Sequence, residues 1–356
     1  MGGAPIRVRP NKSTDAAAAE RLYTDFEADI RWMQRRIRVE YEKLPAAVQS
    51  VAWHYLAKRV RVLPDPNRTV VIPTHPLSPQ PIPYLAFWFA RDFGVKEAKV
   101  RRLLALAMAY VCAGSSPRDD LVDGVVFAAA EQNYVARWLW ELYFDTLKEL
   151  FPAESAIWYL VAKCEADWSR SDRVVLFSEK VAAAKPLSRA FLRETSGYLA
   201  ALITPTLAGV ALLKKRPGAV SSIERFCQTY CMGWRILDDL RDWDEDRVKT
   251  RGCRSSVLAL LRLRAKIPVG EPLPRELAVS LFADAKVTGE IYGAMTKLFR
   301  AARREAERLG AATVVQYIDL QMEGHRMELA QMAAERKKFQ ESLKRLLEAE
   351  AMAQPR

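Results

Sequence analysis

Apolar residues recur every three or four positions along most of this chain, and this spacing constrains the fold more than any other feature of the sequence. Leu22, Phe26 and Ile30 show it near the N-terminus, and the same period continues through most of the residues after Lys96. Alternation typical of a strand occurs only at Thr69–Pro73. The sequence therefore predicts an all-α protein.

The expected helices are separated by short polar or proline-containing breaks. Seven prolines between residues 63 and 83 predict a long irregular connection, because proline interrupts the helical hydrogen-bond ladder. We expect three sections: residues 1–94 with N-terminal helices and this connection, a helical core over 95–310, and a C-terminal helix over 311–356 that continues the same domain. Helices are predicted over residues 15–44, 96–113, 119–150, 154–167, 173–184, 186–215, 220–247, 254–265, 275–309 and 311–351.

Composition and charge narrow the class of protein. Half of the 356 residues are hydrophobic, which is enough for a substantial core, and the formal net charge of +12 suits an anionic partner. The apolar stretch Tyr198–Leu213 is shorter than a membrane span and contains Pro205, so no integral membrane segment is expected. Five cysteines lie scattered in apolar helical sequence without a secretory segment before them, which predicts free thiols and a cytoplasmic location.

The first cluster of acidic residues is Asp119, Asp120 and Asp123 in the segment SPRDDLVDG. Asp119 and Asp123 are four residues apart, so they would share one face of a helix. Pro117 and the apolar residues that follow suggest that a helix begins here. One interpretation is that Asp119 or Asp120 only caps that helix; the other is that the carboxylates bind a cation.

The second cluster lies in ILDDLRDWDED, towards the end of the helix predicted over 220–247. Asp238, Asp242 and Asp246 recur every four residues on one stripe, and Asp239 lies beside them. Carboxylates at this spacing repel one another, and they oppose the helix dipole when they are near a helix C-terminus. A solvated acidic face is the simpler interpretation, but a bound cation would account for the concentration on one stripe.

Taken together, the two clusters predict a magnesium site. Mg²⁺ prefers oxygen ligands and is usually bound through one or two carboxylates together with phosphates and water. Two helices that face each other across a cavity would supply such a partial set, open towards a diphosphate. The predicted metal ligands are Asp119, Asp120, Asp123, Asp238, Asp239, Asp242 and Asp246.

A diphosphate also needs cationic partners. Lys185 and Arg189 lie four residues apart at the start of a predicted helix, Arg235 lies just before the second cluster, and Arg241 lies within it. We predict that these four residues bind substrate; Lys180, Lys249 and Arg251 are further candidates. Among the nine tryptophans, Trp234 adjoins the second cluster and would suit a site for a carbocation through cation–π attraction.

The pattern resembles the class I isoprenoid synthases, which comprise isoprenyl diphosphate synthases, terpene cyclases and squalene/phytoene synthases. DDLVD, residues 119–123, is similar to their first aspartate-rich motif, and DDLRD, residues 238–242, to the second. The continuation WDED is similar to a run in the phytoene synthases, and Lys185 corresponds to a diphosphate-binding lysine of the chain-elongating enzymes. The resemblance implies a helical bundle with an active-site cavity between helices, Mg²⁺ as cofactor, and catalytic roles for Asp119, Asp123, Asp238 and Asp242.

Departures from the family pattern guide the choice of reaction. The glycine-containing segment that holds isopentenyl diphosphate has only a poor counterpart in Lys58–Pro64, and Trp234-Arg235 replaces the usual aromatic-glutamine pair. We therefore expect a terpene synthase that ionises one linear prenyl diphosphate and forms a cyclic or eliminated product. Chain elongation and head-to-head condensation of two prenyl diphosphates are the alternatives.

A basic helical protein that binds nucleic acid or a membrane without catalysis is a remote alternative. Such a protein would gather lysine and arginine on one exposed face, with no need for paired aspartates. The conspicuous charges here are acidic clusters within apolar helices, so no nucleic-acid partner is expected. Peripheral contact with a membrane surface and a homodimer both remain compatible with the sequence.

Overall fold

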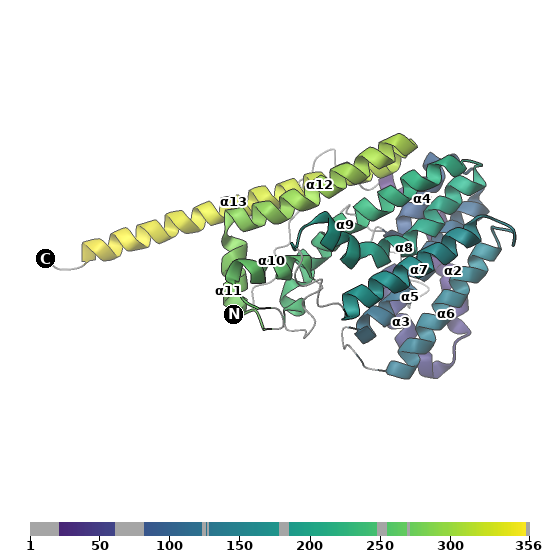
Figure 1. Cartoon of the computed structure of the whole chain (residues 1–356), viewed down its shortest axis with the longest axis horizontal. Coiled ribbons are helices and arrows are strands. Elements are labelled where there is room, and N and C mark those ends of the chain that lie inside the picture. Colours follow the sequence, from purple (N-terminus) through teal and green to yellow (C-terminus); the bar gives the residue numbers. More distant parts are fainter. Residues whose placement is uncertain are drawn as a thin grey trace.

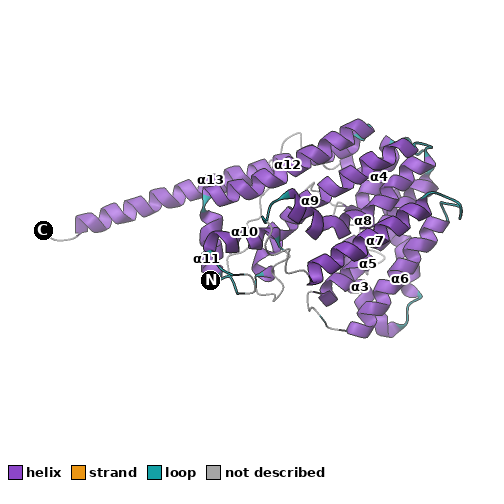
Figure 2. Cartoon of the chain, in the orientation of Figure 1, coloured by secondary structure: helices purple, strands orange, loops and turns teal. Residues whose placement is uncertain are grey.

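The computed structural model describes residues 21–60, 82–122, 126, 128–177, 185–247, 255–268 and 271–353. This part of the chain consists of helices and short connections, without a strand (Figure 2). The expected all-α class is thus confirmed. The strand-like segment Thr69–Pro73 and most of the proline-rich connection lie outside the described residues.

The helices have the following bounds. They are α2 (Glu27–Glu42), α3 (Ala46–Val60), α4 (Ile82–Asp92), α5 (Ala98–Val122), α6 (Ala129–Lys148), α7 (Ile157–Phe177), α8 (Arg189–Leu213), the 3₁₀ helix η2 (Pro217–Ala219), α9 (Val220–Asp246), α10 (Ser256–Ala265), α11 (Arg275–Ala283), α12 (Ala285–Leu309) and α13 (Ala312–Ala353).

The helix with the first aspartate cluster differs from the prediction. Pro117 does not precede a new helix: α5 continues through it to Val122, and α6 begins only at Ala129. The turn around Pro117 is supported by Ser115 and Ser116, whose hydroxyls donate to the carbonyl oxygen of Cys112 at 3.0 and 3.3 Å. Asp119 and Asp120 therefore lie in the last turns of one helix, and the interpretation of either residue as the N-cap of the next helix is wrong.

The helix predicted over 275–309 is also two helices in the structure. The chain leaves the helical conformation at Asp284, with φ −73° and ψ 120°, and its carboxylate accepts a hydrogen bond from the backbone N–H of Lys286 at 2.7 Å. Asp284 is thereby the N-cap of α12. Gly310 ends α12 in a left-handed conformation with φ 72°, which suits glycine at this position.

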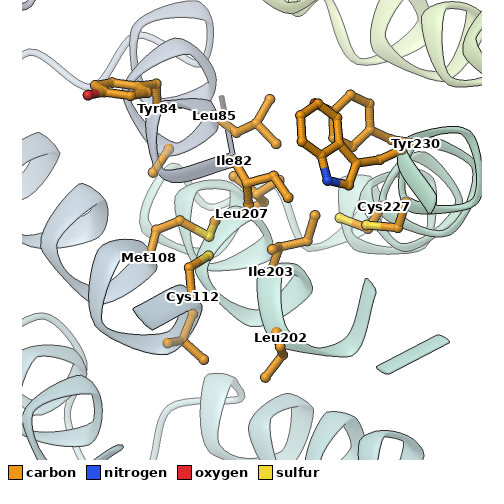
Figure 3. Close-up of a cluster of buried hydrophobic side chains, with 14 of the residues drawn as sticks. Ile82, Tyr84, Leu85, Met108, Cys112, Leu202, Ile203, Leu207, Cys227 and Tyr230 are labelled. Carbon is orange, nitrogen blue, oxygen red and sulfur yellow. The ribbon is translucent and has the colours of Figure 1, made fainter. Parts of the chain in front are cut away.

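The core is centred on α8. This helix is long and apolar enough to span a membrane by length and composition, but 72% of its most apolar window is buried within the protein. It packs against α5, α7 and α9, and Figure 3 shows Leu202, Ile203 and Leu207 of α8 amid side chains of α4, α5 and α9. The burial is that of the central helix of a bundle.

The last two long helices form an antiparallel pair along one side of the bundle. Their order is fixed by contacts at both ends: Arg303 of α12 donates to Asp319 of α13, and Tyr292 of α12 lies beside His325 of α13. The C-terminal part of α13 projects beyond the rest of the molecule (Figure 1). The predicted C-terminal helix is thus present, and its first half completes the core through residues such as Tyr317 and Ile318.

Four of the five cysteines lie in the described part of the chain. Cys112, Cys164, Cys227 and Cys231 are buried and not disulfide-bonded, as the sequence predicts. Burial raises the pKa of the Cys164 and Cys227 thiols to about 12. These side chains therefore serve as small apolar residues of the core.

Candidate functional site

The two aspartate clusters lie at the same end of the bundle. Helices α5 and α8 are antiparallel, because the ammonium group of Lys214 at the end of α8 donates to the carbonyl oxygen of Gly94 just before α5, at 3.0 Å. Further along, Val111 of α5 lies with Leu202 and Pro205 of α8. Since α8 and α9 form an antiparallel hairpin through η2, the C-terminal ends of α5 and α9 both lie near the N-terminus of α8.

The first cluster is partly within the described residues. The backbone of Asp119 belongs to the last turns of α5, Asp120 is half-buried there, and Asp123 lies outside the described residues, as does the side chain of Asp119. Carboxylates near a helix C-terminus face the negative end of the helix dipole. Their position is therefore one that a nearby cation would stabilise.

The second cluster occupies the last two turns of α9. Asp238 and Asp246 are half-buried and Asp242 is exposed, and the four-residue spacing aligns them on one stripe of the helix. This cluster is also at a helix C-terminus, so mutual repulsion and the dipole both raise the free energy of the metal-free state. The stripe remains our prediction for the metal ligands of this helix.

Asp239 has a different environment from its neighbours. It is 1% exposed, one carboxylate oxygen lies 2.9 Å from Nε of Arg235, and the other accepts hydrogen bonds from the backbone N–H and the hydroxyl of Ser256, both at 2.6 Å. Burial raises the pKa of Asp239 to about 6, although Arg235 and Ser256 counteract this effect. Both oxygens are engaged within the protein, which favours a structural role over the predicted direct contact with metal.

Arg235 is the ion-pair partner of Asp239 on α9. Burial by itself lowers the pKa of its guanidinium, but Asp239 and, to smaller extents, Tyr198, Asp238 and Asp246 together more than offset this, and the pKa lies well above its ordinary value. The arginine therefore carries a charge that Asp239 balances. This arrangement favours a role in positioning the second cluster over the predicted direct binding of substrate.

Ser256, the partner of Asp239, belongs to the next helix, α10. It is the first residue of α10, directly after the N-cap Ser255, whose hydroxyl accepts from the backbone N–H of Leu258 at 3.2 Å. The Asp239 carboxylate thus lies at the positive N-terminal end of α10. It connects the acidic end of α9 to α10, a contact that sequence reasoning missed; the Ser-Ser pair before an apolar run is its only trace in the sequence.

Other charged residues of the second motif are also engaged. The Arg241 guanidinium lies over the ring of Trp234, 5.7 Å from its centroid. Asp244 accepts from Arg247 at 2.6 Å and from Arg275 of α11 at 3.1 Å, and these hydrogen bonds lower its pKa. Asp244 therefore belongs to an exposed ion-pair network beside the predicted metal ligands.

Lys185 and Arg189 flank the N-terminus of α8, as predicted. Both are exposed, and between them Ser188 caps the helix by accepting a hydrogen bond from the backbone N–H of Phe191 at 3.2 Å. The topology brings this basic pair to the end of the bundle where both aspartate clusters lie. Lys180, Lys249 and Arg251, the other candidate cations, lie outside the described residues.

The donor set fits Mg²⁺ bound together with a ligand. Within the described ranges, no three acidic, histidine or cysteine side chains converge on a preformed metal centre. Half-buried or exposed carboxylates on two helices at one end of the bundle match the incomplete ligand set that Mg²⁺ uses with phosphates and water. Trp234, only 7% exposed, lies beside this end on α9, whereas Trp140 and Trp168 pack against each other between α6 and α7.

No protein-family model matches this chain, and none of the curated proteins does. Solved structures do match. A geranylgeranyl pyrophosphate synthase from Lactobacillus brevis is 13% identical with a TM-score of 0.64, covering 84% of this chain and 97% of its own. A decaprenyl diphosphate synthase from Rhodobacter capsulatus is 16% identical with a TM-score of 0.62, covering 86% and 99%.

A third similar structure is a polyprenyl synthase from Caulobacter crescentus, complexed with calcium and isoprenyl diphosphate. It is 16% identical with a TM-score of 0.58, and the match covers 87% of this chain and 98% of the other. At such identities the likeness is one of fold. The chain has the all-α fold of the isoprenyl diphosphate synthases, and the fold expected from the two motifs is confirmed.

Proposed function

We propose that this protein is a prenyltransferase: an enzyme that ionises an allylic prenyl diphosphate and joins its prenyl group to a second prenyl diphosphate. The observation that carries the proposal is the position of the two aspartate clusters at the same end of the bundle. Asp119 and Asp120 are at the C-terminal end of α5, Asp238 and Asp242 are at that of α9, and Lys185 precedes the N-terminus of α8 at this end. Structures with this fold are named as geranylgeranyl pyrophosphate and decaprenyl diphosphate synthases, which supports elongation over the cyclisation expected from the sequence.

Each group of residues has a distinct task in this proposal. Asp119, Asp120, Asp123, Asp238, Asp242 and Asp246 would hold Mg²⁺, which when bound would offset the negative charge that develops on the departing diphosphate. Lys185 and Arg189 would donate charge-assisted hydrogen bonds to the diphosphate oxygens. Arg235 and Asp239 would keep the end of α9 in register with α10. Trp234 would present an aromatic face beside the allylic group.

Conversion of a single substrate by a terpene synthase is the second candidate. The observation in its favour is the replacement of the usual glutamine by Arg235, whose guanidinium has no amide group and is paired with Asp239. The weak counterpart of the isopentenyl-diphosphate segment, Lys58–Pro64, lies mostly outside the described residues. An enzyme without that second site would ionise one diphosphate and direct its cation to a cyclic or eliminated product.

The deciding experiment supplies purified protein and Mg²⁺ with linear C10, C15 or C20 allylic diphosphates, each with and without isopentenyl diphosphate. Longer prenyl diphosphates formed only with isopentenyl diphosphate would support elongation. A hydrocarbon or alcohol from one allylic substrate would favour terpene synthesis instead. Asp242→Asn is the inactive control, because it removes a proposed Mg²⁺ ligand. This exposed side chain can be changed without disturbing the core. Absence of any product, together with absence of magnesium-dependent diphosphate binding, would reject both functions.

A further inference from the structure

The inner face of α13 carries two polar side chains that are buried without a partner. Gln321 is 0% exposed and His325, one helical turn further, is 2% exposed. Within the described part of the chain, neither Nε2 nor Oε1 of Gln321 has a hydrogen-bond partner, and Nε2 of His325 has none. Three polar atoms thus face the interior between α9, α12 and α13.

Aromatic side chains pack around His325. The His325 ring stacks on Phe299 of α12, with centroids 5.9 Å apart and planes at 20°, and meets the edge of Tyr292 at 6.4 Å. Phe299 also contacts Tyr230 of α9, whose hydroxyl lies 3.3 Å from that of Tyr317, one turn before Gln321. His325 thus packs among aromatic rings and Gln321 is fully buried one turn before it, so an unmade hydrogen bond of either side chain is costly.

The tautomer of His325 follows from its second nitrogen. Nδ1 lies 3.4 Å from a carboxylate oxygen of Glu328, so in a neutral ring the proton on Nδ1 would face this carboxylate and Nε2 would be an acceptor. The Gln321 amide offers two N–H donors and one acceptor. A molecule that fits both residues must donate to His325 and also hydrogen-bond to the amide, while remaining small enough for a space between packed rings.

We propose that Gln321 and His325 form an internal binding site for one or two ordered water molecules between α9, α12 and α13. Water would donate to Nε2 of His325 and bridge to the Gln321 amide, so that the buried polar atoms are satisfied. The site lies beyond Tyr230 in the direction of the acidic end of α9, and it does not depend on which reaction the enzyme catalyses.

A crystal structure of the full chain that resolves ordered solvent tests the proposal directly. We expect electron density for water within hydrogen-bond distance of both the Gln321 amide and Nε2 of His325. A direct Gln321–His325 hydrogen bond after rotation of either side chain would overturn the proposal. So would a dry site.

Thermal melting of variants gives an independent test because the two models predict opposite signs. If water bridges the pair, Gln321→Met should lower the melting temperature, and the loss should shrink in a His325→Phe background because both side chains share the water. If the site is dry, Gln321→Met removes an unsatisfied amide and should raise the melting temperature. Gln331→Met is the matched control, since its amide bonds to the exposed Glu335 on the same helix.

Discussion

Arg235 and Asp239, one turn apart on α9, form an ion pair of 2.9 Å beside the acidic stripe of Asp238, Asp242 and Asp246. Ser256 of α10 completes the arrangement with two hydrogen bonds to the same carboxylate. The second aspartate cluster thus combines two kinds of carboxylate. Asp239 is enclosed and joins α9 to α10, whereas Asp238 and Asp246 are half-buried and Asp242 is exposed.

Asp239→Asn should reveal the cost of breaking this pair. The amide cannot balance the charge of Arg235, so we expect the free energy of unfolding to fall by about 3 kcal/mol. Chemical denaturation of the metal-free protein measures this change. Asp244→Asn is the control, because its ion pairs are exposed and should be worth less than about 1 kcal/mol. Equal effects of the two substitutions would contradict a buried charge pair. By the same reasoning, Arg235→Ala should also destabilise the fold.

Asp238→Asn should separate a metal ligand from a solvated acidic face. Removing one charge of the stripe relieves repulsion, so stability without ligand should stay equal or rise by a few tenths of a kcal/mol. Stabilisation by Mg²⁺ with inorganic diphosphate should decrease, and turnover should fall steeply. Melting curves with and without that ligand, beside product assays, measure both effects. Glu245→Gln, at an exposed carboxylate about two turns further along α9, is the control. A variant at Asp238 with full ligand stabilisation and turnover would exclude Asp238 from the site.

Lys185→Ala should weaken diphosphate binding without changing stability. The exposed ammonium group contributes one charge-assisted contact, worth roughly 1.5–3 kcal/mol, so the Kd for magnesium diphosphate should rise by about 10-fold or more. Calorimetric titration provides the measurement. Lys297→Ala, an exposed lysine on α12, should bind as the parent does. If the two variants bind equally, the anion site lies away from the start of α8.

Two glycines should respond in opposite ways to alanine. A Cβ at Gly209 of α8 would lie 2.9 Å from Cζ of the Phe151 ring, whereas a Cβ at Gly293 of α12 would meet no atom within 4 Å. Gly209→Ala should therefore destabilise the protein by about 1–2 kcal/mol through overpacking. Gly293→Ala should stabilise it by about 0.5–1 kcal/mol, since alanine favours the helix. Denaturant unfolding of both variants tests this; the same sign for both would contradict the close packing of α8.

The buried thiols predict a loss of stability in alkali. Burial raises the pKa of Cys227 to about 12 from an ordinary value of 9.0, so the unfolded chain loses this proton at lower pH than the folded protein. The contribution is constant below pH 9 and falls above it, by about 1.4 kcal/mol per pH unit. Unfolding of the parent and of Cys227→Ala between pH 8 and 10.5 should show a shallower decline in the variant. Rapid alkylation of the Cys227 peptide in native protein at pH 8 would contradict this prediction.

The sequence predicted some helices closely because their patterns are long and uniform. Predicted bounds of 220–247 for α9 agree with the observed Val220–Asp246 to within one residue. The error at α5 arose because proline is typical of a first helical turn, whereas here the helix tolerates Pro117 near its end. The contact of Asp239 with Ser256 joins residues from different helices and has no local period. Sequence spacing therefore identified the second cluster but not which of its aspartates is enclosed.

Proline 117 also sets the local stability of the first cluster. Because it has no N–H, the carbonyl of Ala113 receives no helical hydrogen bond from it, and the turn carrying Asp119 and Asp120 is joined to α5 by one bond fewer. Opening this turn thus requires less free energy than opening the corresponding turn of α9, whose ladder contains no proline. Backbone amides at the end of α5 should exchange with deuterium before those at the end of α9. A ligand shared by the two clusters should slow exchange most at the end of α5.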